Sequence, residues 1–431
     1  MTGKRVLLAF CILLVVWWSG TLAQPSGNSC LKCHLRLDWR LADPAKKIAD
    51  DIHQKSGLSC ADCHGGDPTI TDAKTSMSPA RGFRGAPLAK DIPGFCGRCH
   101  GSPETMRKFN PSLATDQLEK YWTSKHGQLL RKGDNKVAEC VSCHGVHDMR
   151  AVNDPISMVY SLNVPRTCSR CHGNAQYMES YRLPFNQFEL YRNSVHGLAL
   201  LKRGDTGAPA CNDCHGNHAA MPPGFASVGK VCYQCHPAEG ELFEASPHKE
   251  GFDALGEEEC VFCHGNHGIQ HPTDSELGVG EKAICIKCHE KGDAGYNATV
   301  AMRKAIDILV ATYDTSKVQL EVSQAKGVEV SDAIFRLKDV QDAIVNVRKL
   351  IHAFNEEKFT TAANQALVLA NDINREGSRA SAEVTFRRLG LAVFTAITLI
   401  LLFIVYRKIR KIDKKTKNKP YKRTNGIHYT H

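Results

Sequence analysis

The chain has 431 residues, of which 42% are hydrophobic and 7% aromatic, and 19 of them are cysteines. Its net charge of +10 is concentrated at the two ends, because ten Lys/Arg and one Asp follow Tyr406, and Lys4 and Arg5 lie near the start. The rest of the chain is close to neutral and lacks the positive field that would neutralise phosphates, so these numbers exclude nucleic acid as a partner.

Residues 1–23 have the pattern of a secretory signal peptide. Lys4 and Arg5 precede an apolar run from Val6 to Trp18, and small residues follow up to Ala23. The run is too short to span a bilayer comfortably. We expect cleavage after Ala23, which would remove Cys11 with the signal; an uncleaved anchor is the alternative.

Between residues 24 and 296, eighteen cysteines form nine C-x-x-C pairs, and a histidine directly follows every pair. The pairs are Cys30 with Cys33, Cys60 with Cys63, Cys96 with Cys99, Cys140 with Cys143, Cys168 with Cys171, Cys211 with Cys214, Cys232 with Cys235, Cys260 with Cys263, and Cys285 with Cys288. The histidines are His34, His64, His100, His144, His172, His215, His236, His264 and His289. Two cysteines at this spacing can form thioether bonds to both vinyl groups of a haem, and the next histidine then lies under the iron as its proximal ligand.

Zinc, iron–sulfur clusters and disulfides also use C-x-x-C pairs. A zinc ribbon needs no histidine directly after each pair, and only 20 of the 431 residues are His, so nine coincidences are not credible. Nine C-x-x-C disulfides in one exported chain would be strange. The sequence therefore predicts nine covalent haem c groups. Since this region has few long apolar periods, we expect the haems to form its core and the haem-free chain to be largely unstructured.

The clusters are arranged in a repeat. A complete unit contains S-x-H, then C-x-x-C-H-G-x-H, then a plain C-x-x-C-H, and complete units span 124–172, 194–236 and 246–289. A fourth unit, 53–100, is degenerate, because Gly66-Asp67 stands where the trailing histidine should be. The cluster Cys30–His34 stands alone in front of it.

Nine further histidines could serve as distal ligands, once His428 and His431 in the basic tail are set aside. Eight are our candidates: His53, His126, His147, His196, His218, His248, His267 and His271. The ninth, His352, lies beside the apolar stripe of a predicted helix and is more typical of an ordinary bundle histidine. Nine histidines for nine irons indicate mostly bis-histidine haems. A trailing histidine cannot reach the far side of its own haem, and we expect His126 and His147 to serve the two irons of their own unit.

The first three haems, on His34, His64 and His100, have the fewest candidate distal histidines near them in the sequence. Met77 or Met106 could ligate one of them, which would raise its potential, or a position could be open and permit substrate chemistry. We expect any catalytic or high-potential iron among these three.

Residues 297–386 are predicted to form a helical hairpin or bundle. Asn297 can cap a helix that runs to about Lys326, where Gly327 ends it, and Ser331 or Asp332 can cap a second helix with one apolar face. A third helix is predicted from about residue 356 to 373, ending before Gly377.

A last helix is predicted to start near Ser378 and to cross a membrane at 387–407. Residues 389–406 carry no charge and are long enough for one span. The basic tail at 408–431 then lies in the cytoplasm by the positive-inside rule. We expect the haem region in the periplasm, anchored to the bacterial inner membrane. The predicted fold is thus a mostly irregular, short-helix multihaem domain organised by its haems, followed by an all-α segment and one C-terminal transmembrane helix.

With its C-x-x-C-H-G-x-H motifs at Cys140–His147, Cys211–His218 and Cys260–His267, the region 30–289 resembles the doubled-CXXCH multihaem c-type cytochromes. It looks like their membrane-anchored bacterial members, and this resemblance implies electron transfer between the quinone pool and periplasmic acceptors. We expect an electron conduit in respiration, without catalytic residues. Its expected partners are a membrane quinone-reactive or b-type cytochrome subunit and periplasmic cytochromes or reductases, because the span itself has no histidine to bind a b-type haem.

Two other functions remain open at this point. A multihaem reductase or dehydrogenase of a small nitrogen or sulfur compound would need one open haem, often marked by a variant cluster such as C-x-x-C-K, and none occurs here. A polymerising extracellular cytochrome filament is the third possibility, and the predicted anchor argues against it.

Overall fold

The protein is described by a computed structural model that covers residues 28–222 and 228–417. The predicted signal peptide and the predicted tail beyond Lys417 lie outside the described residues. Within the described ranges every regular element is a helix and none is a strand, which confirms the predicted fold class. The chain divides into two compact units, residues 1–232 with 257–271 and residues 233–256 with 272–431. Residues 233–256 and 272–296, which we predicted within the haem domain, thus group with the C-terminal helices.

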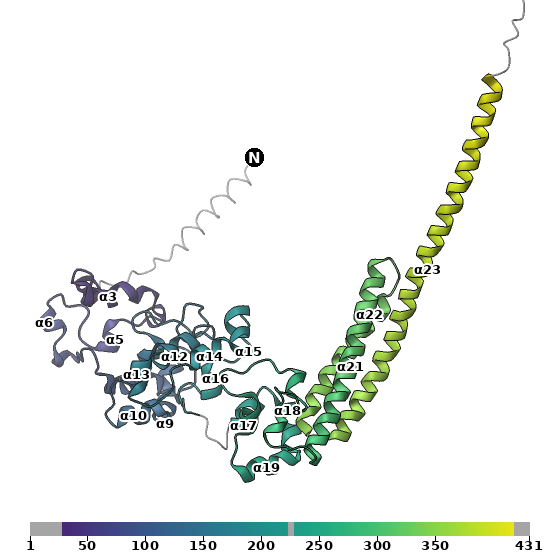
Figure 1. The fold of residues 1–431 in the computed structure, drawn as a ribbon. Coiled ribbons are helices and arrows are strands. Elements are labelled where there is room, and N and C mark those ends of the chain that lie inside the picture. Colours follow the sequence, from purple (N-terminus) through teal and green to yellow (C-terminus); the bar gives the residue numbers. More distant parts are fainter. Residues whose placement is uncertain (1–27, 223–227, 418–431) are drawn as a thin grey trace, which may run out of the picture. The chain divides into compact units, whose positions relative to one another are not determined.

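The first unit consists of short helices joined by irregular chain (Figure 1). Its α-helices are α2 (Ser29–His34), α3 (Trp39–Lys47), α4 (Ile52–Lys55), α5 (Cys60–His64), α6 (Ala73–Ser76), α7 (Ile92–His100), α8 (Pro103–Met106), α9 (Gln117–Thr123), α10 (Lys125–Arg131), α11 (Cys140–His144), α12 (Val164–His172), α13 (Ala175–Glu179), α14 (Gln187–Arg192), α15 (Val195–Gly197), α16 (Cys211–His215) and α20 (Glu259–His264), and α17 (Val228–Tyr233) lies at its boundary. Three 3-10 turns, η1 (Ile48–Asp50), η2 (Pro79–Arg81) and η3 (Ala89–Asp91), and one π turn, η4 (Leu198–Lys202), complete it.

The apolar core of the first unit is small and follows the repeat. Its buried clusters are Tyr121, Leu130 and Val137 in one unit of the repeat, and Tyr191, Leu200 and Ala210 in the next. The Tyr121 hydroxyl donates to the carbonyl of Ala138 at 3.0 Å, and the Tyr191 hydroxyl donates to the carbonyl of Pro209 at 2.8 Å. Each tyrosine therefore fixes the backbone two residues ahead of a C-x-x-C-H cluster.

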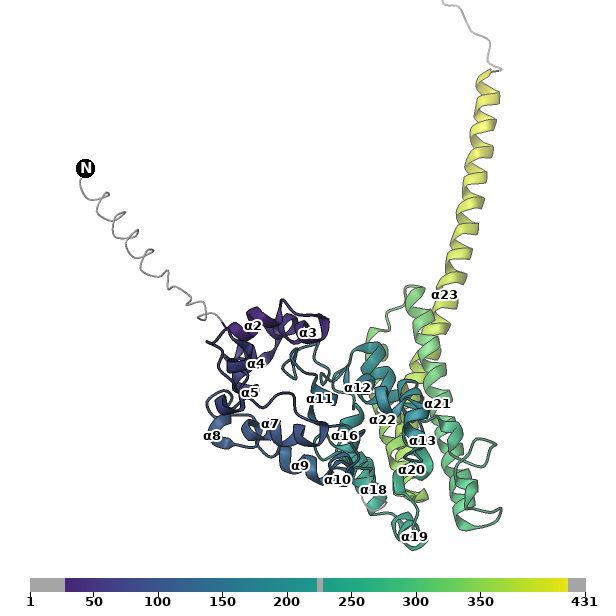
Figure 2. The ribbon, with the colours of Figure 1, turned by 90° about the vertical axis from the view of Figure 1, so that its left-hand side faces the viewer.

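The second unit contains α18 (Pro237–Glu244), α19 (Pro247–Leu255), the 3-10 turns η6 (Asp274–Glu276), η7 (Cys285–Lys287) and η8 (Leu350–Ala353), and the long helices α21 (Ala294–Ala325), α22 (Ser331–Lys349) and α23 (Glu356–Lys417). The three long helices run side by side as a bundle (Figure 2). The first begins three residues before Asn297, because Asp293 accepts a hydrogen bond from the Tyr296 N–H and caps it. It ends before Gly327, as predicted. Gly327 has a φ of 81°, a conformation that a residue without a Cβ adopts readily.

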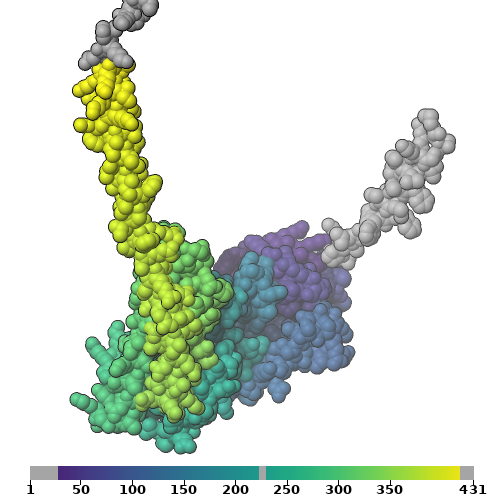
Figure 3. Space-filling view, turned by 90° about the vertical axis from the view of Figure 1, so that its right-hand side faces the viewer, coloured from purple at the N-terminus to yellow at the C-terminus, as the bar shows by residue number. Residues whose placement is uncertain are grey.

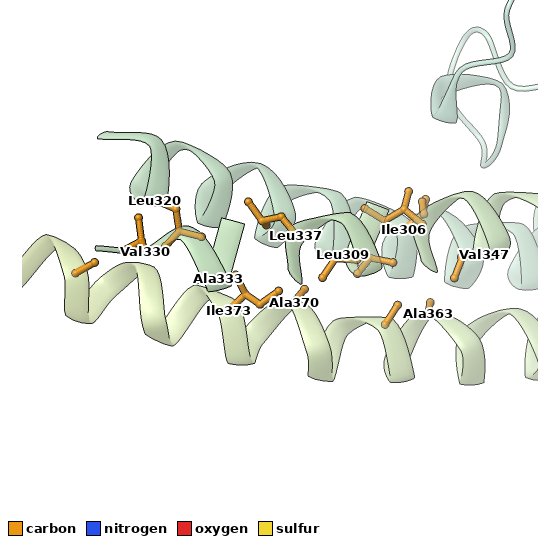
Figure 4. Packing of buried hydrophobic residues seen from close by; sticks show 14 of the residues in the cluster. Ile306, Leu309, Leu320, Val330, Ala333, Leu337, Val347, Ala363, Ala370 and Ile373 are labelled. Atoms are coloured by element: carbon orange, nitrogen blue, oxygen red, sulfur yellow. The ribbon is translucent and has the colours of Figure 1, made fainter. Parts of the chain in front are cut away.

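The bundle encloses the largest apolar core of the described chain (Figure 4). Ile306, Leu309 and Leu320 of α21 are fully buried against Val340 of α22 and Ile373 of α23. These residues recur at helical spacing, so each helix turns one apolar face inward. The predicted bundle is therefore present, with its own core.

The break that we predicted before Gly377 is wrong. Helix α23 runs without interruption for 62 residues and includes both the predicted third helix and the predicted membrane span. Gly377 is buried, and a Cβ there would lie 3.0 Å from the Gln319 side chain of α21. The glycine therefore allows close helix packing rather than ending the helix, and the tertiary contacts outweigh its low helix propensity.

Of the described residues, one helix, α23, has a stretch long and apolar enough to cross a membrane, and none of that stretch is buried in the protein. Leu391, Phe394 and Ile400 are all more than half exposed. Figure 3 shows this end of α23 projecting beyond the other two bundle helices.

Candidate haem sites

Most C-x-x-C-H clusters lie at the C-terminal end of a short helix. Helices α2, α5, α7, α11, α12, α16 and α20 each end at the histidine of a cluster. Residues three and four apart share one face of a helix, so both cysteines and the histidine point to the same side. No group of three or more His, Cys, Asp or Glu that could hold a metal ion occurs among the described residues, whereas a structural zinc site needs four such ligands.

The motif cysteines are accessible, and no disulfide joins any of them in the described part of the chain. The first cysteine of every cluster is half-buried. The second cysteines are half-buried or exposed, namely Cys63, Cys143, Cys171 and Cys263 in the first class and Cys33, Cys99, Cys214, Cys235 and Cys288 in the second. Each cluster therefore presents both of its thiols where a haem vinyl group could reach them, as the predicted thioether attachment requires.

In six described ring contacts a cluster histidine faces a second histidine, and in each of these pairs the partner is one of the distal candidates. The pairs, with the distance between ring centroids, are His53–His100 (6.0 Å), His64–His147 (6.1 Å), His126–His172 (6.1 Å), His144–His218 (6.1 Å), His215–His267 (5.8 Å) and His248–His289 (5.9 Å). Neither two cluster histidines nor two distal candidates are paired with each other in this set.

This spacing fits an iron atom between the rings. An iron bound by one nitrogen of each imidazole at about 2 Å would hold the centroids about 6 Å apart, because each centroid lies about 1 Å behind its nitrogen. Rings in direct contact are closer, as the tilted rings of His248 and Phe354 are, with 3.7 Å between centroids. The residues present therefore fit a haem whose iron is bound on both faces by histidine.

The pairs fall into two classes. A histidine upstream of a unit faces the second cluster of its own unit, as His126 faces His172, and these three pairs have ring planes 61–83° apart. A trailing histidine faces the first cluster of the preceding unit, as His147 faces His64, and these three pairs are within 26° of parallel. We expected His147 to serve its own unit; the structure instead places it against the unit before, because a trailing histidine lies on the wrong side of its own cluster.

Backbone hydrogen bonds join each unit to the next in the same register. The N–H of Ile52 donates to the carbonyl of Met149 at 2.8 Å, Lys125 donates to Ala220 at 3.0 Å, and Val195 donates to Ile269 at 2.9 Å. In each case the donor directly precedes an upstream histidine and the acceptor lies two residues after a trailing one. In the last unit the donor position is Pro247, which has no N–H, so the series ends there.

Burial favours the neutral form of eight of the paired imidazoles. Desolvation lowers the pKa of His144 to about 4, and His218 and His100 add to the effect. Desolvation is also the largest cause of the lowered pKa of His100, His126, His147, His172, His218, His248 and His267. A neutral imidazole is the form that binds metal, because its unprotonated nitrogen has a lone pair to donate.

Several ligands are oriented by hydrogen bonds from their other ring nitrogen. Nδ1 of His34 lies 2.9 Å from the carbonyl oxygen of Leu41, and Nδ1 of His64 lies 2.9 Å from that of Gly85. A carbonyl oxygen can only accept, so Nδ1 is the protonated nitrogen and Nε2 is left to bind the metal.

The distal candidate His53 has a different partner, the carboxylate of Asp51. Asp51 is only 2% exposed, and its Oδ1 lies 2.9 Å from Nδ1 of His53. It also accepts the backbone N–H groups of His53 and Met149. Burial alone would raise the pKa of Asp51, but the hydrogen bonds from His53 and Met149 outweigh it, so the pKa lies below its usual value. Asp51 is therefore an ionised carboxylate that orients one ligand.

The other units have a serine at the position of Asp51. Ser124, Ser194 and Ser246 are all at most 6% exposed. The Ser124 hydroxyl donates to the carbonyl of Tyr121 at 2.6 Å and accepts the Gly127 N–H at 2.9 Å, so it caps the helix that carries His126. The sequence pattern S-x-H thus marks a capped ligand helix, and in D-x-H the aspartate is a carboxylate partner of the histidine.

Where a contact between the cysteines of two clusters is described, the two clusters are neighbours along the chain. Within a unit, burial raises the pKa of Cys63 and the neighbouring Cys99 raises it further. The same two causes, burial and then Cys168, raise the pKa of Cys143 to about 11. Between units the thiols lie close enough to shift each other's pKa, in the pairs Cys96–Cys140, Cys168–Cys211 and Cys232–Cys260. In the first two clusters, burial is the largest cause of the raised pKa of Cys60, and the neighbouring Cys30 is the second. Successive haems bound at these cysteines would be close neighbours.

The last cluster is built into the base of the helical bundle. The first turn of α21 packs on His289, since a Cβ on Gly295 would lie 2.1 Å from the imidazole. The partner ring, His248, stacks on Phe354, which follows η8 with a φ of 45°. The segment from Gly295 to Phe354 thus supplies contacts to both histidines of this site. Sequence patterns did not indicate Gly295, Phe354 or Asp51, and only the D-x-H in place of S-x-H was a usable signal.

Three clusters remain to be placed. His34, His236 and His264 are not in the six pairs, and neither are the candidates His196, His271 and His352. The repeat predicts His196 as the partner of His236, because it occupies the position of His126 in its unit. His271 remains a prediction. His352, which we interpreted as an ordinary bundle histidine, has its Nδ1 3.0 Å from the carbonyl oxygen of Lys349.

Residues 52–173 match the family model described as cytochrome c3, and residues 231–309 match the model described as cytochrome c554 and c-prime. No curated protein and no solved structure matches the chain. Both matches are to c-type cytochromes, and they cover seven of the nine clusters in whole. The chain is therefore a multihaem c-type cytochrome. Within that class it is an electron carrier that binds haem c covalently, similar to cytochrome c3 in its early repeat units and to cytochrome c554 where its clusters meet the long helices.

Proposed function

We propose that the chain conducts electrons along a row of nine haems, between a quinone-linked partner in the bacterial inner membrane and redox partners in the periplasm. The observation that carries the proposal is the order of the clusters, because each cluster for which a cysteine contact is described has its sequence neighbour beside it. Haem iron supplies the chemistry by gaining and losing one electron. The residues of the chain supply the spacing and the two axial ligands.

The paired histidines suit conduction rather than catalysis. A histidine on each face fills both axial positions of the iron and leaves no place for a substrate. Because each trailing histidine belongs to the unit after the cluster that it faces, neighbouring haems are also held together by the chain itself. The row therefore changes little in shape when electrons pass along it.

Three features support attachment to the membrane with the haems outside the cytoplasm. The N-terminal segment has the pattern of a secretory signal, α23 contains an exposed apolar stretch, and ten Lys/Arg follow Tyr406. Covalent haem c is attached outside the cytoplasm, and the positive-inside rule gives the same orientation. A quinone-reactive or b-type cytochrome subunit is the partner that we propose in the membrane, with cytochromes or reductases in the periplasm.

The test uses inner membranes that contain the full-length holoprotein, prepared from hosts with and without quinone. Addition of NADH should reduce its haem bands in the quinone-containing membranes only. Equal reduction in both preparations would overturn the quinone link.

A variant without the fourth haem, Cys140→Ala with Cys143→Ala, tests the row. Haems on the entry side of the gap should be reduced at the normal rate and the others should lag at least tenfold. Val141→Ala in the same cluster is the control and should show one phase. A single unchanged phase in the double variant would contradict conduction along the row.

A further inference from the structure

The haem on His34 differs from all the paired haems, and three observations define the difference. First, the position of its cluster in the repeat can be assigned. Cys30 approaches Cys60 as the second cluster of each later unit approaches the first cluster of the next, in Cys96–Cys140 and Cys168–Cys211. The cluster Cys30–His34 therefore occupies the place of a second cluster.

The backbone after the histidine agrees with this assignment. The first clusters are each followed by a glycine with positive φ, namely Gly65, Gly145, Gly216 and Gly265 at 71–79°. The residue after His34 is Leu35, whose φ of −63° is helical. The second clusters His100 and His172 are followed by Gly101 and Gly173, whose φ values of −93° and −95° are also negative.

The pairing rule then states which histidine the haem on His34 would need. A second cluster is faced by the upstream histidine of its own unit, as His53 faces His100 and His248 faces His289. The 431 residues contain no histidine before His34. The rule also explains Asp67. A trailing histidine at that position would serve the first cluster of a preceding unit, and residues 1–29 contain no C-x-x-C-H. Asp67 accepts hydrogen bonds from Arg81 at 2.8 Å and Thr69 at 2.6 Å.

No other histidine replaces the missing ligand. In the part of the chain that the structure describes, no histidine ring faces His34; its ring has a described contact only with the carbonyl of Leu41. His64, His100 and their partners His147 and His53 are already matched with each other. The candidates outside the pairs, His196 and His271, belong to the last two units of the repeat, more than 160 residues after Cys30 in the sequence.

The proximal side of this haem is nevertheless complete. Cys30, Cys33 and His34 lie on α2, and the Leu41 carbonyl orients the ring. Ser29 fixes the start of the helix, because its N–H donates to the Pro68 carbonyl at 2.8 Å and its hydroxyl donates to the Ile70 carbonyl at 2.7 Å. The residues for covalent attachment and the proximal ligand are thus in place at this cluster, and it is the second axial ligand that the histidines do not supply.

We infer that the haem on His34 has an exchangeable distal position that binds a small ligand of the nitric oxide or carbon monoxide type, at one end of the electron-conducting row. The inference depends on the proposed function in one respect. If electrons move along the row of haems, those that reach this end arrive at a site able to bind a small molecule. The sequence led us to expect a catalytic or high-potential iron among the haems on His34, His64 and His100; the structure favours the haem on His34.

The test is spectroscopic and uses the purified full-length holoprotein. Resonance Raman and electron paramagnetic resonance spectra should show one high-spin haem among low-spin ones, and the dithionite-reduced protein should bind one carbon monoxide per chain. Cys30→Ala with Cys33→Ala should remove one haem together with all carbon monoxide binding. Cys96→Ala with Cys99→Ala removes a paired haem instead and should leave that binding in place.

His53→Ala is the internal control, because it deprives the haem on His100 of its facing ring and should double the carbon monoxide bound. A wild-type protein that is entirely low-spin and inert to carbon monoxide would overturn the inference. So would the near-infrared charge-transfer band of a methionine-ligated ferric haem that disappears with Cys30 and Cys33. Neither result would affect quinone-dependent reduction, so failure of the two proposals can be told apart.

Discussion

The carboxylate of Asp51 is the largest chemical difference between the otherwise similar distal ligands. It is ionised, buried and hydrogen-bonded to Nδ1 of His53, whereas the equivalent serines bond only to backbone. A carboxylate behind a metal-bound imidazole makes the ring a stronger donor and favours the oxidised metal. The haem between His53 and His100 should therefore have a lower potential than its neighbours with serine.

Replacing Asp51 with serine tests this effect. Asp51→Ser should raise the midpoint potential of one haem by about 60 mV, the one-electron equivalent of a tenfold change in relative affinity for the two oxidation states. Potentiometric titration of the holoprotein measures the shift. Asp50→Ser is the matched control, since Asp50 has the same charge but is 65% exposed and contacts Lys55 and Arg150. Equal shifts in both variants would indicate a general charge effect rather than the hydrogen bond.

Residue patterns in the sequence predicted the cysteines and the proximal histidine of each site. They did not predict which distant histidine faces it. The proximal set follows from covalent chemistry within five consecutive residues, as in Cys140–His144. The partner of His64 is His147, 83 positions away, and that pairing depends on how one unit docks on the next. Asp51 carried a signal only by comparison with Ser124 and Ser194, and the contact of Phe354 with His248 has no local signature at all.

At the scale of elements, the three-helix bundle is the part of the molecule that depends least on haem. Nineteen buried residues form its core, while the clusters around Tyr121 and Tyr191 have three each. Phe359 of α23 has no exposed surface, so its removal leaves a cavity between helices. The amphipathic spacing predicted these helices, but Gly377 was misread, because propensity ignores the Gln319 side chain that packs against it.

Phe359→Ala should lower the free energy of unfolding of the bundle by about 3–5 kcal/mol. The midpoint of urea-induced loss of the helical circular dichroism signal, measured on the full chain in detergent, reports the change. Phe335→Ala removes the same side chain at a position that is 73% exposed and should cost less than about 0.5 kcal/mol. Similar losses for the two variants would show that the core described for the bundle does not carry its stability.

For the whole molecule, the sequence predicted the order of its parts. The C-x-x-C-H clusters come first, the amphipathic helices follow, and an uncharged stretch comes after them. The sequence could not reveal that residues 233–256 and 272–296 fold with the long helices. They do so because His248 and His289 pack against Phe354 and Gly295. The helical segment is thus part of a haem site as well as a connection to the anchor.

A chain that ends at residue 386 should separate these roles. It should retain nine haems per chain and leave the membrane fraction without detergent, because the exposed apolar stretch of α23 is removed while the bundle core is kept. Haem content by pyridine haemochrome and the distribution after ultracentrifugation measure both outcomes. A truncated protein that stays with the membranes would mean that another surface anchors the chain.

Because α23 is unbroken, its length fixes the distance between the site of His248 and His289 and the start of the apolar stretch. The α21–α22 turn lies where the apolar stretch begins, since Arg387 donates to the Gly327 carbonyl at 3.0 Å, and the site of His248 and His289 lies at the opposite end of the bundle beside Phe354. The helix rises about 46 Å between Glu356 and Arg387 at 1.5 Å per residue. Under the proposed membrane attachment, a partner that exchanges electrons with this last haem would have to present its own redox group tens of ångströms above the bilayer. The length of α23 would then select partners by their height above the membrane.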